Sequence, residues 1–394
     1  MKIIDRYICG KFLLNFFYVY SSLAIIYVLV DLTANVGDYF SSGSLSRTLL
    51  ALPAYYFINS FALLDVTIPI SIALAALITT VIMDHGKELI ALLAMGISPA
   101  RTMVPLVVGG IALSLLFSCV REFYLPNHMV AATRPFKDYV LVSDECPVRD
   151  RATDYKTEIS FDGDAVNLKT NVLSKPSLSL PKALSRYGNR ITAVDAVYLP
   201  TENDRPQGWL LRGATSPSEL LKNESLRDES SQEILVYSPS DTEWLNENEV
   251  FVPTSLNPLR LAVGSSWSQY ASIWDLSAAI NDPAFRPEAV VLAMRAHSRA
   301  LRLATDLLPM FLAVPFIFMK KDKIFWIAAA QGTFFASAYV AANYACVYWG
   351  KTLRVAAIGL WGANLVFVPI AAVIWCELVG NGSTAQNSKR ARKA

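Results

Sequence analysis

Charged residues and histidine are scarce in this sequence of 394 residues. Only 17% of the residues are charged and only three are histidines, whereas 53% are hydrophobic. An average soluble domain has about 25% charged residues. The formal net charge is +2, which indicates no surface for nucleic acid. The composition therefore argues against an ordinary soluble enzyme, and it excludes disorder or a coiled coil as a description of the whole chain.

Motifs that carry catalytic or redox chemistry are missing as well. The sequence contains no HExxH, CxxC, GxSxG, Walker A or dinucleotide-binding motif. His85, His128 and His297 lie beside hydrophobic runs, so a catalytic triad would have to form at a membrane surface. Four of the five cysteines lie in or beside such runs, and Cys146 is left alone, which argues against a disulfide framework. We therefore predict no catalytic residue, no metal site and no cofactor bound by this chain.

Long hydrophobic runs are what the sequence has instead. A bilayer core of about 30 Å needs about 20 apolar helical residues, and a helix satisfies its own backbone polar groups in lipid. The first run is too long for the apolar part of a signal peptide, so we expect it to stay attached. Six runs are predicted to span a membrane, three before and three after a central region: 12–30, 48–83, 103–120, 303–319, 324–350 and 355–376.

The central region has the composition of a soluble domain, since 44 of the 68 charged residues lie between positions 121 and 302. Short alternating or β-branched segments follow one another from about Lys156 to Val263: KTEISF, AVNL, RITAVDAVYL, GWLLRGAT, EILVY and NEVFVP. Turn-forming segments such as DGD, YGNR and TENDRPQG separate them. We predict an antiparallel sandwich or barrel-like fold, followed by a helix over 274–280.

Lysine and arginine predict the orientation. With a cytoplasmic N-terminus, the short inner segments hold 12 basic residues and the short outer loops hold three. The positive-inside rule then places both termini and the loop 84–102 in the cytoplasm and the region 121–302 outside. The inner residues are Lys2, Arg6, Lys11, Lys87, Arg101, Lys320, Lys321, Lys323, Lys389, Arg390, Arg392 and Lys393, and the outer ones are Arg47, Lys351 and Arg354.

The loop from Asp84 to Arg101, DHGKELIALLAMGISPAR, has the pattern of a short amphipathic helix. Glu88 lies near the helix start, where the helix dipole favours an acid, and Gly96 and Pro99 favour its end. Its apolar stripe consists of Leu89, Leu92 and Leu93. Such a helix either lies in the membrane interface or docks into a groove of a cytoplasmic partner.

Polar residues in or beside hydrophobic runs are costly and are therefore functional candidates. In one interpretation the carboxylates line a cavity or pair with nearby arginines. In the other they lie at the membrane interface or form hydrogen bonds between helices. The arginines recur at helical spacing and either meet lipid phosphates or anchor a helix at the interface. The candidates for lipid contact or cavity lining are Asp31, Asp65, Arg295, Arg299, Arg302 and Asp306.

The order of three helices, a β-rich insert and three helices resembles the LptF/LptG (YjgP/YjgQ) permeases. The resemblance is carried by DRYI at 5–8, by RITAVDAVYLP followed by GWLLRGA, and by HSRALRLATDLLPMFLAVPF at 297–316. Its most specific part is a block of the form E-[LI]-x-x-[LM]-x-A-x-G-[IVLM]-S, about nineteen residues after a proline. Pro69, Glu88, Leu89, Ala94, Gly96 and Ser98 occupy these positions.

The resemblance implies a membrane α-helical fold with six transmembrane helices (3+3) and an inserted extracytoplasmic all-β, jellyroll-like domain. It divides the chain into helices 1–3 (1–122), which include a coupling helix at 84–98, and a periplasmic jellyroll-like domain (123–298). Helices 4–6 (299–378) and a basic cytoplasmic tail (379–394) follow. The ATPase-coupling residues that it implies are Glu88, Leu89, Leu92, Ala94, Gly96 and Ser98.

The function that the resemblance implies is that of a non-catalytic permease subunit in an ABC transporter of the bacterial inner membrane. Such a transporter extracts lipopolysaccharide, or a related glycolipid, and passes it to a periplasmic bridge of jellyroll proteins. The implied partners are a second permease of this type, in a hetero- or homodimer, and a cytoplasmic ABC ATPase dimer that uses ATP and Mg²⁺. One departure concerns the outer end of the first helix, where family members carry lysines and this chain carries Asp31 and Asp38.

Two alternatives remain at this level. The helices could anchor a periplasmic enzyme or lipid-binding protein that is not coupled to an ATPase, but six helices are more than an anchor needs. A permease of the lipoprotein-releasing type usually has four helices, with its large exported domain after the first one. The three-plus-three order of this sequence argues against it.

Overall fold

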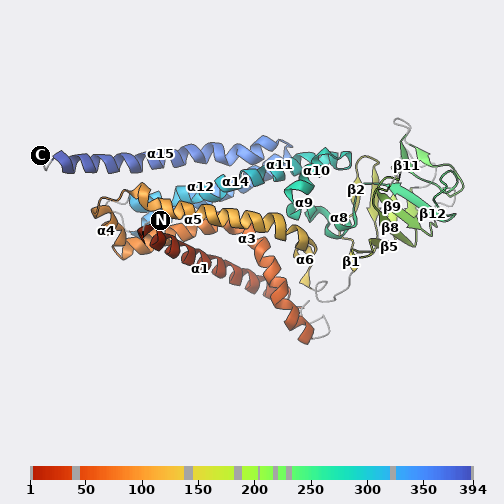
Figure 1. Ribbon diagram of the computed structural model, residues 1–394, viewed down its shortest axis with the longest axis horizontal. Coiled ribbons are helices and arrows are strands. Elements are labelled where there is room, and N and C mark those ends of the chain that lie inside the picture. The colour runs from red at the N-terminus through yellow and green to blue at the C-terminus, as the bar shows by residue number, and fades with distance from the viewer. Residues whose placement is uncertain are drawn as a thin grey trace. The chain divides into compact units, whose positions relative to one another are not determined.

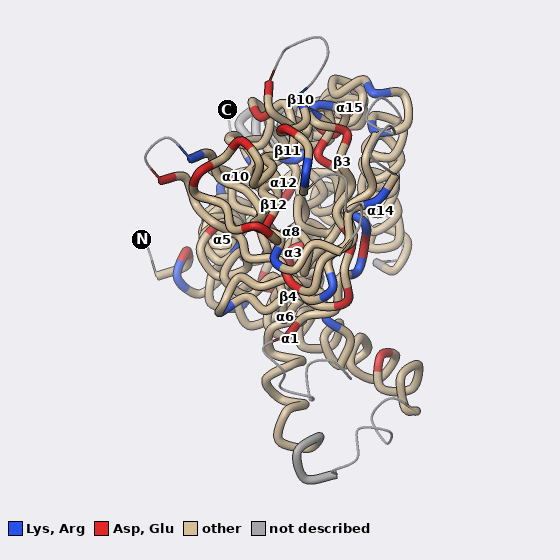
Figure 2. The backbone as a smooth tube through the Cα atoms, turned by 90° about the vertical axis from the view of Figure 1, so that its right-hand side faces the viewer, with Lys and Arg blue, Asp and Glu red and all other residues tan. Residues whose placement is uncertain are grey.

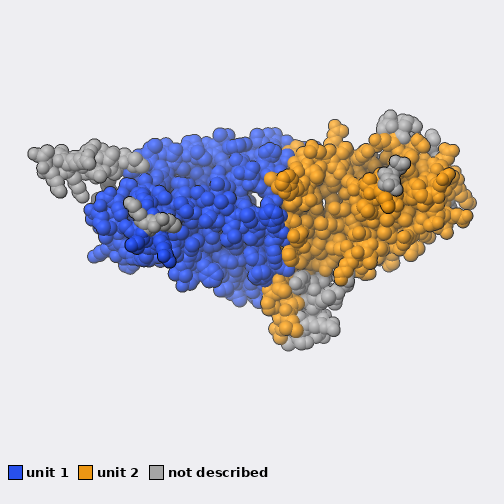
Figure 3. Space-filling model, in the orientation of Figure 1, with its two compact units in different colours: residues 1–36, 56–124, 293–394 blue, residues 37–55, 125–292 orange. Residues whose placement is uncertain are grey.

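A computed structural model describes residues 3–37, 45–136, 145–181, 189–202, 205–215, 221–227, 233–319 and 325–391. The chain forms two compact units (Figure 3). The helical unit comprises residues 1–36, 56–124 and 293–394, and the strand unit comprises 37–55 and 125–292. Outside the described residues lie Lys2, Asp38, Lys320, Lys321, Lys323, Arg392 and Lys393, and the side chains of Arg47, Lys389 and Arg390.

Long helices make up the helical unit. Within it α1 lies against α5, α5 against α12, α12 against α14, and α14 against α15 (Figure 1). Helices α3 and α11 each continue across the boundary between the units. The bounds are α1 (Ile3–Ala34), α3 (Leu45–His85), α4 (Glu88–Ala94), α5 (Pro99–Cys119), η1 (Val120–Tyr124, a π-helical turn), α11 (Ala289–Ala300), α12 (Arg302–Ala313), α13 (Pro315–Phe318), α14 (Phe325–Thr352) and α15 (Ala356–Ala391).

Four helices among the described residues are long and apolar enough to cross a membrane: Ile3–Ala34, Leu49–His85, Pro99–Tyr124 and Ala356–Leu378. A fifth is added if the pair Pro283–Ala300 and Arg302–Phe318, bent by 61°, counts as one span. The run predicted over 324–350 forms the 28-residue helix α14, which does not meet the same criterion. The fold is that of a multi-pass helical membrane protein, and the sixth span stays a prediction.

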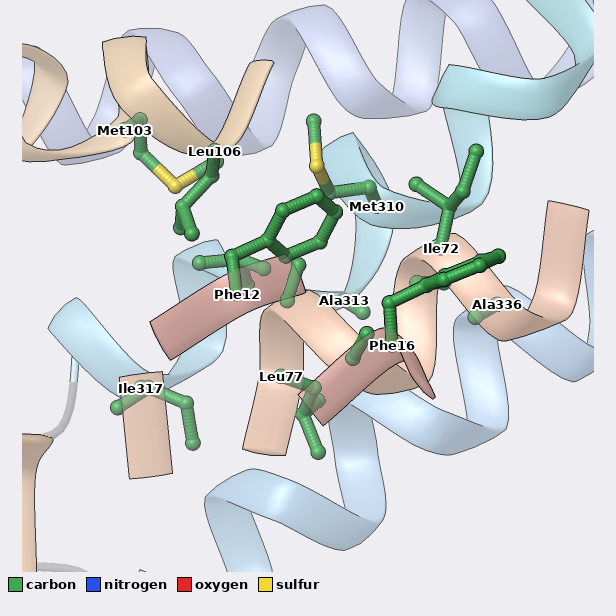
Figure 4. Packing of buried hydrophobic residues seen from close by; sticks show 14 of the residues in the cluster. Phe12, Phe16, Ile72, Leu77, Met103, Leu106, Met310, Ala313, Ile317 and Ala336 are labelled. Carbon is green, nitrogen blue, oxygen red and sulfur yellow. The ribbon is translucent and has the colours of Figure 1, made fainter. Parts of the chain in front are cut away.

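The core of the helical unit is a cluster of apolar side chains from several helices (Figure 4). Phe12 and Phe16 of α1 lie there beside Ile72 of α3, Leu106 of α5 and Met310 of α12. In lipid, where apolar surface gains little by burial, such close van der Waals packing holds helices together. Helix α1 contributes a single stripe of buried residues to this cluster, namely Ile8, Phe12 and Phe16, and Asn15 is buried beside them in the sequence.

The strand unit contains antiparallel sheets throughout its described part. A six-stranded sheet has the order β1-β4-β5-β8-β9-β12, a four-stranded sheet has the order β2-β3-β6-β7, and β10 pairs with β11. The bounds are β1 (Glu145–Pro147), β2 (Ala152–Asp154), β3 (Ile159–Asp162), β4 (Ala165–Asn167), β5 (Val172–Ser174), β6 (Ser177–Ser179), β7 (Arg190–Thr192), β8 (Asp195–Leu199), β9 (Gly208–Arg212), β10 (Leu226–Arg227), β11 (Ile234–Val236) and β12 (Glu249–Pro253).

Short helices precede and follow the strands, and one of them was predicted. The segment expected to be helical at 274–280 lies inside α10. The bounds are η2 (Pro126–His128), α6 (Met129–Thr133), α8 (Pro258–Val263), η4 (Gly264–Ser266), α9 (Trp267–Tyr270), α10 (Ile273–Asn281) and η5 (Pro283–Glu288). Acidic and basic residues are interspersed around β3, β10, β11 and β12 (Figure 2), as expected of a unit that carries most of the charge.

Strand β9 lies next to the edge of the six-stranded sheet, where it pairs with β8 on one side and with the edge strand β12 on the other. Trp209 of β9 is fully buried, and its indole N–H donates to the carbonyl oxygen of Leu256 at 2.8 Å. A buried tryptophan needs such a partner for its only donor. The β-rich prediction for the central region is confirmed, and its jellyroll arrangement stays a prediction.

A buried aspartate joins β2 to the segment after β12. Asp154 is 2% exposed, accepts a hydrogen bond from the Thr254 hydroxyl at 2.6 Å and accepts another from the Lys156 backbone N–H at 2.8 Å. We expect Asp154→Ala to destabilise this part of the unit, because each buried group left without a partner costs about 1–3 kcal/mol. Faster amide exchange in β2 and β12 checks this. Asp164→Ala, which breaks only an exposed pair with Lys175, should leave exchange unchanged.

Candidate functional site

The loop between α3 and α5 contains the short helix α4, within the segment predicted to be helical. Lys87 before it adopts a left-handed conformation and makes no side-chain cap. Gly96 after it has a φ of 85°, a conformation that glycine adopts without strain. Helix α5 then begins with Ser98, whose hydroxyl oxygen accepts a hydrogen bond from the Arg101 backbone N–H at 3.3 Å. The loop is therefore a sharply bounded helix between two turns.

The two faces of α4 have different environments. Leu89 and Leu92 are 2% and 8% exposed and belong to the core of the helical unit. Ile90, Leu93 and Met95, which we call the outer face of α4, are exposed. Of the other predicted coupling residues, Ala94, Gly96 and Ser98 are exposed and Glu88 is half-buried. The surface that α4 offers to a partner is therefore the outer face, not the stripe of Leu89 and Leu92.

Glu88 is bound to the first turns of α1. The Lys11 ammonium lies 2.9 Å and 3.0 Å from its two carboxylate oxygens, and the Tyr7 hydroxyl donates to one of them at 3.0 Å. The hydrogen bond from Lys11 holds the pKa of the Glu88 carboxyl below its ordinary value, although desolvation opposes this. A second ion pair joins Arg101 to Asp5 at 2.8 Å. The loop is thus attached to α1 at two points.

A buried charge cluster joins α3, η1 and α12. Asp65 of α3 pairs with Arg121 of η1 and with Arg302, the first residue of α12. One turn further along α12, Asp306 pairs with Arg302 at 3.4 Å and accepts a hydrogen bond from the Ser114 hydroxyl at 2.6 Å. All four charged side chains are at least 86% buried. Two carboxylates and two guanidinium groups can share a buried site because the attraction between their opposite charges offsets the cost of removing them from water.

Of the other candidates, Arg299 and Arg295 lie close enough to Arg121 to interact with it electrostatically. Arg299 pairs with Glu122 of η1 at 3.0 Å. Asp31 accepts a hydrogen bond from the Tyr56 hydroxyl at 2.9 Å and another from the Asn35 side chain at 3.0 Å. Arg295 is half-buried on α11. The structure therefore gives Arg299 and Arg302 carboxylate partners within the chain.

Three members of these networks, Ser114, Arg121 and Glu122, were not predicted. Arg121 and Glu122 come directly after the third hydrophobic run, but they were not among the polar residues selected beside the runs. They lie on a π-helical turn, a distortion that is frequent at functional sites. An arginine and a glutamate together at the end of an apolar run are the signal that could have found them.

Within the residues that the structure describes, no three of histidine, cysteine, aspartate and glutamate come together so as to hold a metal ion. All five cysteines are free. The two sites are therefore a surface loop that is bound to α1 and a buried charge cluster that connects α3, η1 and α12.

These features define a multi-pass membrane protein with a β-rich insert and a structured polar loop between two spans. Residues 6–142 match the family model described as lipopolysaccharide export system permease LptF/LptG. The match confirms the predicted family resemblance over α1, α3, α4 and α5, including Lys11, Glu88 and Arg101. A comparison with curated proteins found no match.

Proposed function

We propose that this chain is a permease subunit of an ATP-driven ABC transporter that extracts lipopolysaccharide, or a related glycolipid, from the bacterial inner membrane. The observation that carries the proposal is the loop between α3 and α5. It lies within the family match, has the E…A-x-G-[IVLM]-S block, and exposes apolar side chains at Ile90, Leu93 and Met95. Exposed apolar residues on a structured polar loop are a feature of a docking surface.

In this proposal α4 is the coupling helix, which inserts its outer face into a groove of a cytoplasmic ATPase dimer. The ATPase binds ATP and Mg²⁺, and this chain supplies no phosphate-binding motif. A second permease of the same type completes the membrane part. The six-span topology with α14 as fifth span, cytoplasmic termini, a periplasmic jellyroll over 123–298 and transfer to bridge proteins belong to the same proposal.

Affinity purification of the full chain from a bacterial membrane tests the proposal. Co-purification of a nucleotide-binding ATPase, a second permease and bound glycolipid is the expected result. A pure, folded preparation without an ATPase would favour the alternative, an anchored periplasmic enzyme or lipid-binding protein. The identity of the bound lipid would also show whether this chain binds a lipid other than lipopolysaccharide. That question arises because Asp31 stands where family members carry lysines.

We expect Glu88→Lys to abolish ATP-dependent lipid extraction while the protein stays folded in the membrane. The change places an ammonium beside that of Lys11 and removes the carboxylate through which the coupling helix is bound to α1. Extraction from proteoliposomes and thermal stability in detergent are the two measurements. Glu247→Lys, the same change at an exposed position of the strand unit, is the matched control. Wild-type extraction by Glu88→Lys would remove the coupling role from this residue.

A further inference from the structure

Helix α4 is too short to be stable by itself. It has seven residues, and Lys87, the residue before it, makes no side-chain cap. Isolated helices of fewer than about 12 residues are marginal in water. Its position therefore depends on contacts outside the helix, which are the buried side chains of Leu89 and Leu92 and the ion pair of Glu88.

Two ion pairs of the loop are formed with the same helix, α1. Glu88 at the start of α4 binds Lys11, and Arg101 in the first turn of α5 binds Asp5. Asp5 and Lys11 are six positions apart in α1, which corresponds to about 9 Å along a helix. Two attachment points at this separation prevent the loop from pivoting about either of them. The Tyr7 hydroxyl strengthens the first point by donating to the same carboxylate.

Of the four candidate spans among the described residues, helix α1 has the smallest buried share. Only 11% of its most apolar stretch is buried, against 56% for Leu49–His85, 39% for Pro99–Tyr124 and 22% for Ala356–Leu378. It contacts the core through one stripe, whereas α3 contributes more of the residues in that core. A displacement of the loop therefore meets the least resistance in α1.

We infer that the ion pairs Lys11–Glu88 and Arg101–Asp5 make the loop and the first turns of α1 move as one body, so that ATPase-driven motion of α4 is passed to α1. Lys11, Asp5 and Arg101 are positioning residues in this scheme, because they act through α4. The inference rests on the proposed function for the source of the motion. The attachment itself does not depend on it.

The attachment is tested by hydrogen exchange of the full chain in detergent. Lys11→Gln should speed exchange of the α4 amides, whereas Lys11→Arg should retain the ion pair and wild-type exchange. Lys87→Gln is the matched control, since it makes the same change at an exposed lysine next to Glu88. Wild-type exchange of α4 in Lys11→Gln would overturn the inference, whatever the transporter does.

The transmission is tested in proteoliposomes with the co-purified ATPase. Lys11→Gln should retain the ATPase, because Ile90, Leu93 and Met95 are unchanged, but should release at least about fivefold less lipid per ATP hydrolysed. Asp5→Arg should show the same loss, and Asp5→Arg with Arg101→Asp should recover it by restoring the pair. Normal lipid release by both Lys11→Gln and Asp5→Arg would overturn the inference.

Failure of the proposed function has a different signature. In that case the wild-type chain itself co-purifies no ATPase and releases no lipid on addition of ATP. The exchange experiment would still decide whether α4 is held by α1. The two failures are therefore distinguishable in the same set of preparations.

Discussion

Asp65→Asn is expected to destabilise the helical unit by about 3–5 kcal/mol. The change removes the carboxylate shared by Arg121 and Arg302, whose side chains are 13% and 11% exposed. A buried guanidinium that loses a carboxylate partner keeps the cost of desolvation but has less attraction to compensate for it. The measurement is the thermal unfolding midpoint of the full chain in one detergent, together with the yield of folded protein.

Two further variants sharpen this test. Asp31→Asn makes the same change at an aspartate whose partners include the Tyr56 hydroxyl and an asparagine, so it should have a small effect. Asp65→Asn with Arg121→Met removes one buried positive charge along with the acid, and should recover part of the stability while Arg302 keeps Asp306. If Asp65→Asn were as stable as Asp31→Asn, the charge cluster would not hold the helices together.

Gly332→Leu is expected to separate α14 from α12 and to lower stability by at least about 1–3 kcal/mol. A side chain at this position would overlap the carbonyl oxygen of Ala313 and lie 2.8 Å from a methyl group of Leu77. The carbonyl belongs to the backbone of α12, so rotation of a side chain cannot relieve the overlap. The unfolding midpoint in detergent measures the effect.

Gly10→Leu is the matched control for this variant. Gly10 lies in α1 with nothing within 4 Å of an added side chain, so leucine should be tolerated there. Equal stability of Gly332→Leu and Gly10→Leu would show that the close approach of α12 and α14 is not needed. A loss confined to Gly332→Leu would show that α14 is an integral part of the helical unit, which its composition alone does not establish.

Local patterns in the sequence predicted the parts of this molecule that depend on neighbouring residues. Five of the six hydrophobic runs coincide with long helices, and the block from Glu88 to Ser98 contains α4. The run 303–319 forms two shorter helices, α12 and α13. Such patterns do not identify contacts between residues that are far apart in the chain. Glu88 and Lys11 are 77 residues apart, and Asp65 and Arg302 are 237 apart. The periods of a helix or a strand relate only residues within one element, so they do not connect either pair.

The strand unit shows a second reason why the sequence did not predict contacts between distant residues. RITAVDAVYL was predicted as one strand segment, but its first part forms β7 in the four-stranded sheet and its second part β8 in the six-stranded sheet. Between them the Ala193 backbone N–H donates to Pro176 and that of Val194 donates to Arg212. Alternating hydrophobicity reports which face of a strand is buried, not which strand lies beside it, so the change of sheet leaves no mark on the pattern.

The discontinuous make-up of the helical unit has a consequence for its biosynthesis. Its last segment begins at residue 293, after the whole strand unit has been translated. At about 5–20 residues per second, the ribosome needs on the order of 10–40 seconds to proceed from Arg121 to Arg302. Asp65 and Arg121 are both made before that interval and can neutralise each other while they wait. The nascent helices thus hold a provisional charge pair, which the arrival of Arg302 and Asp306 converts into the finished network.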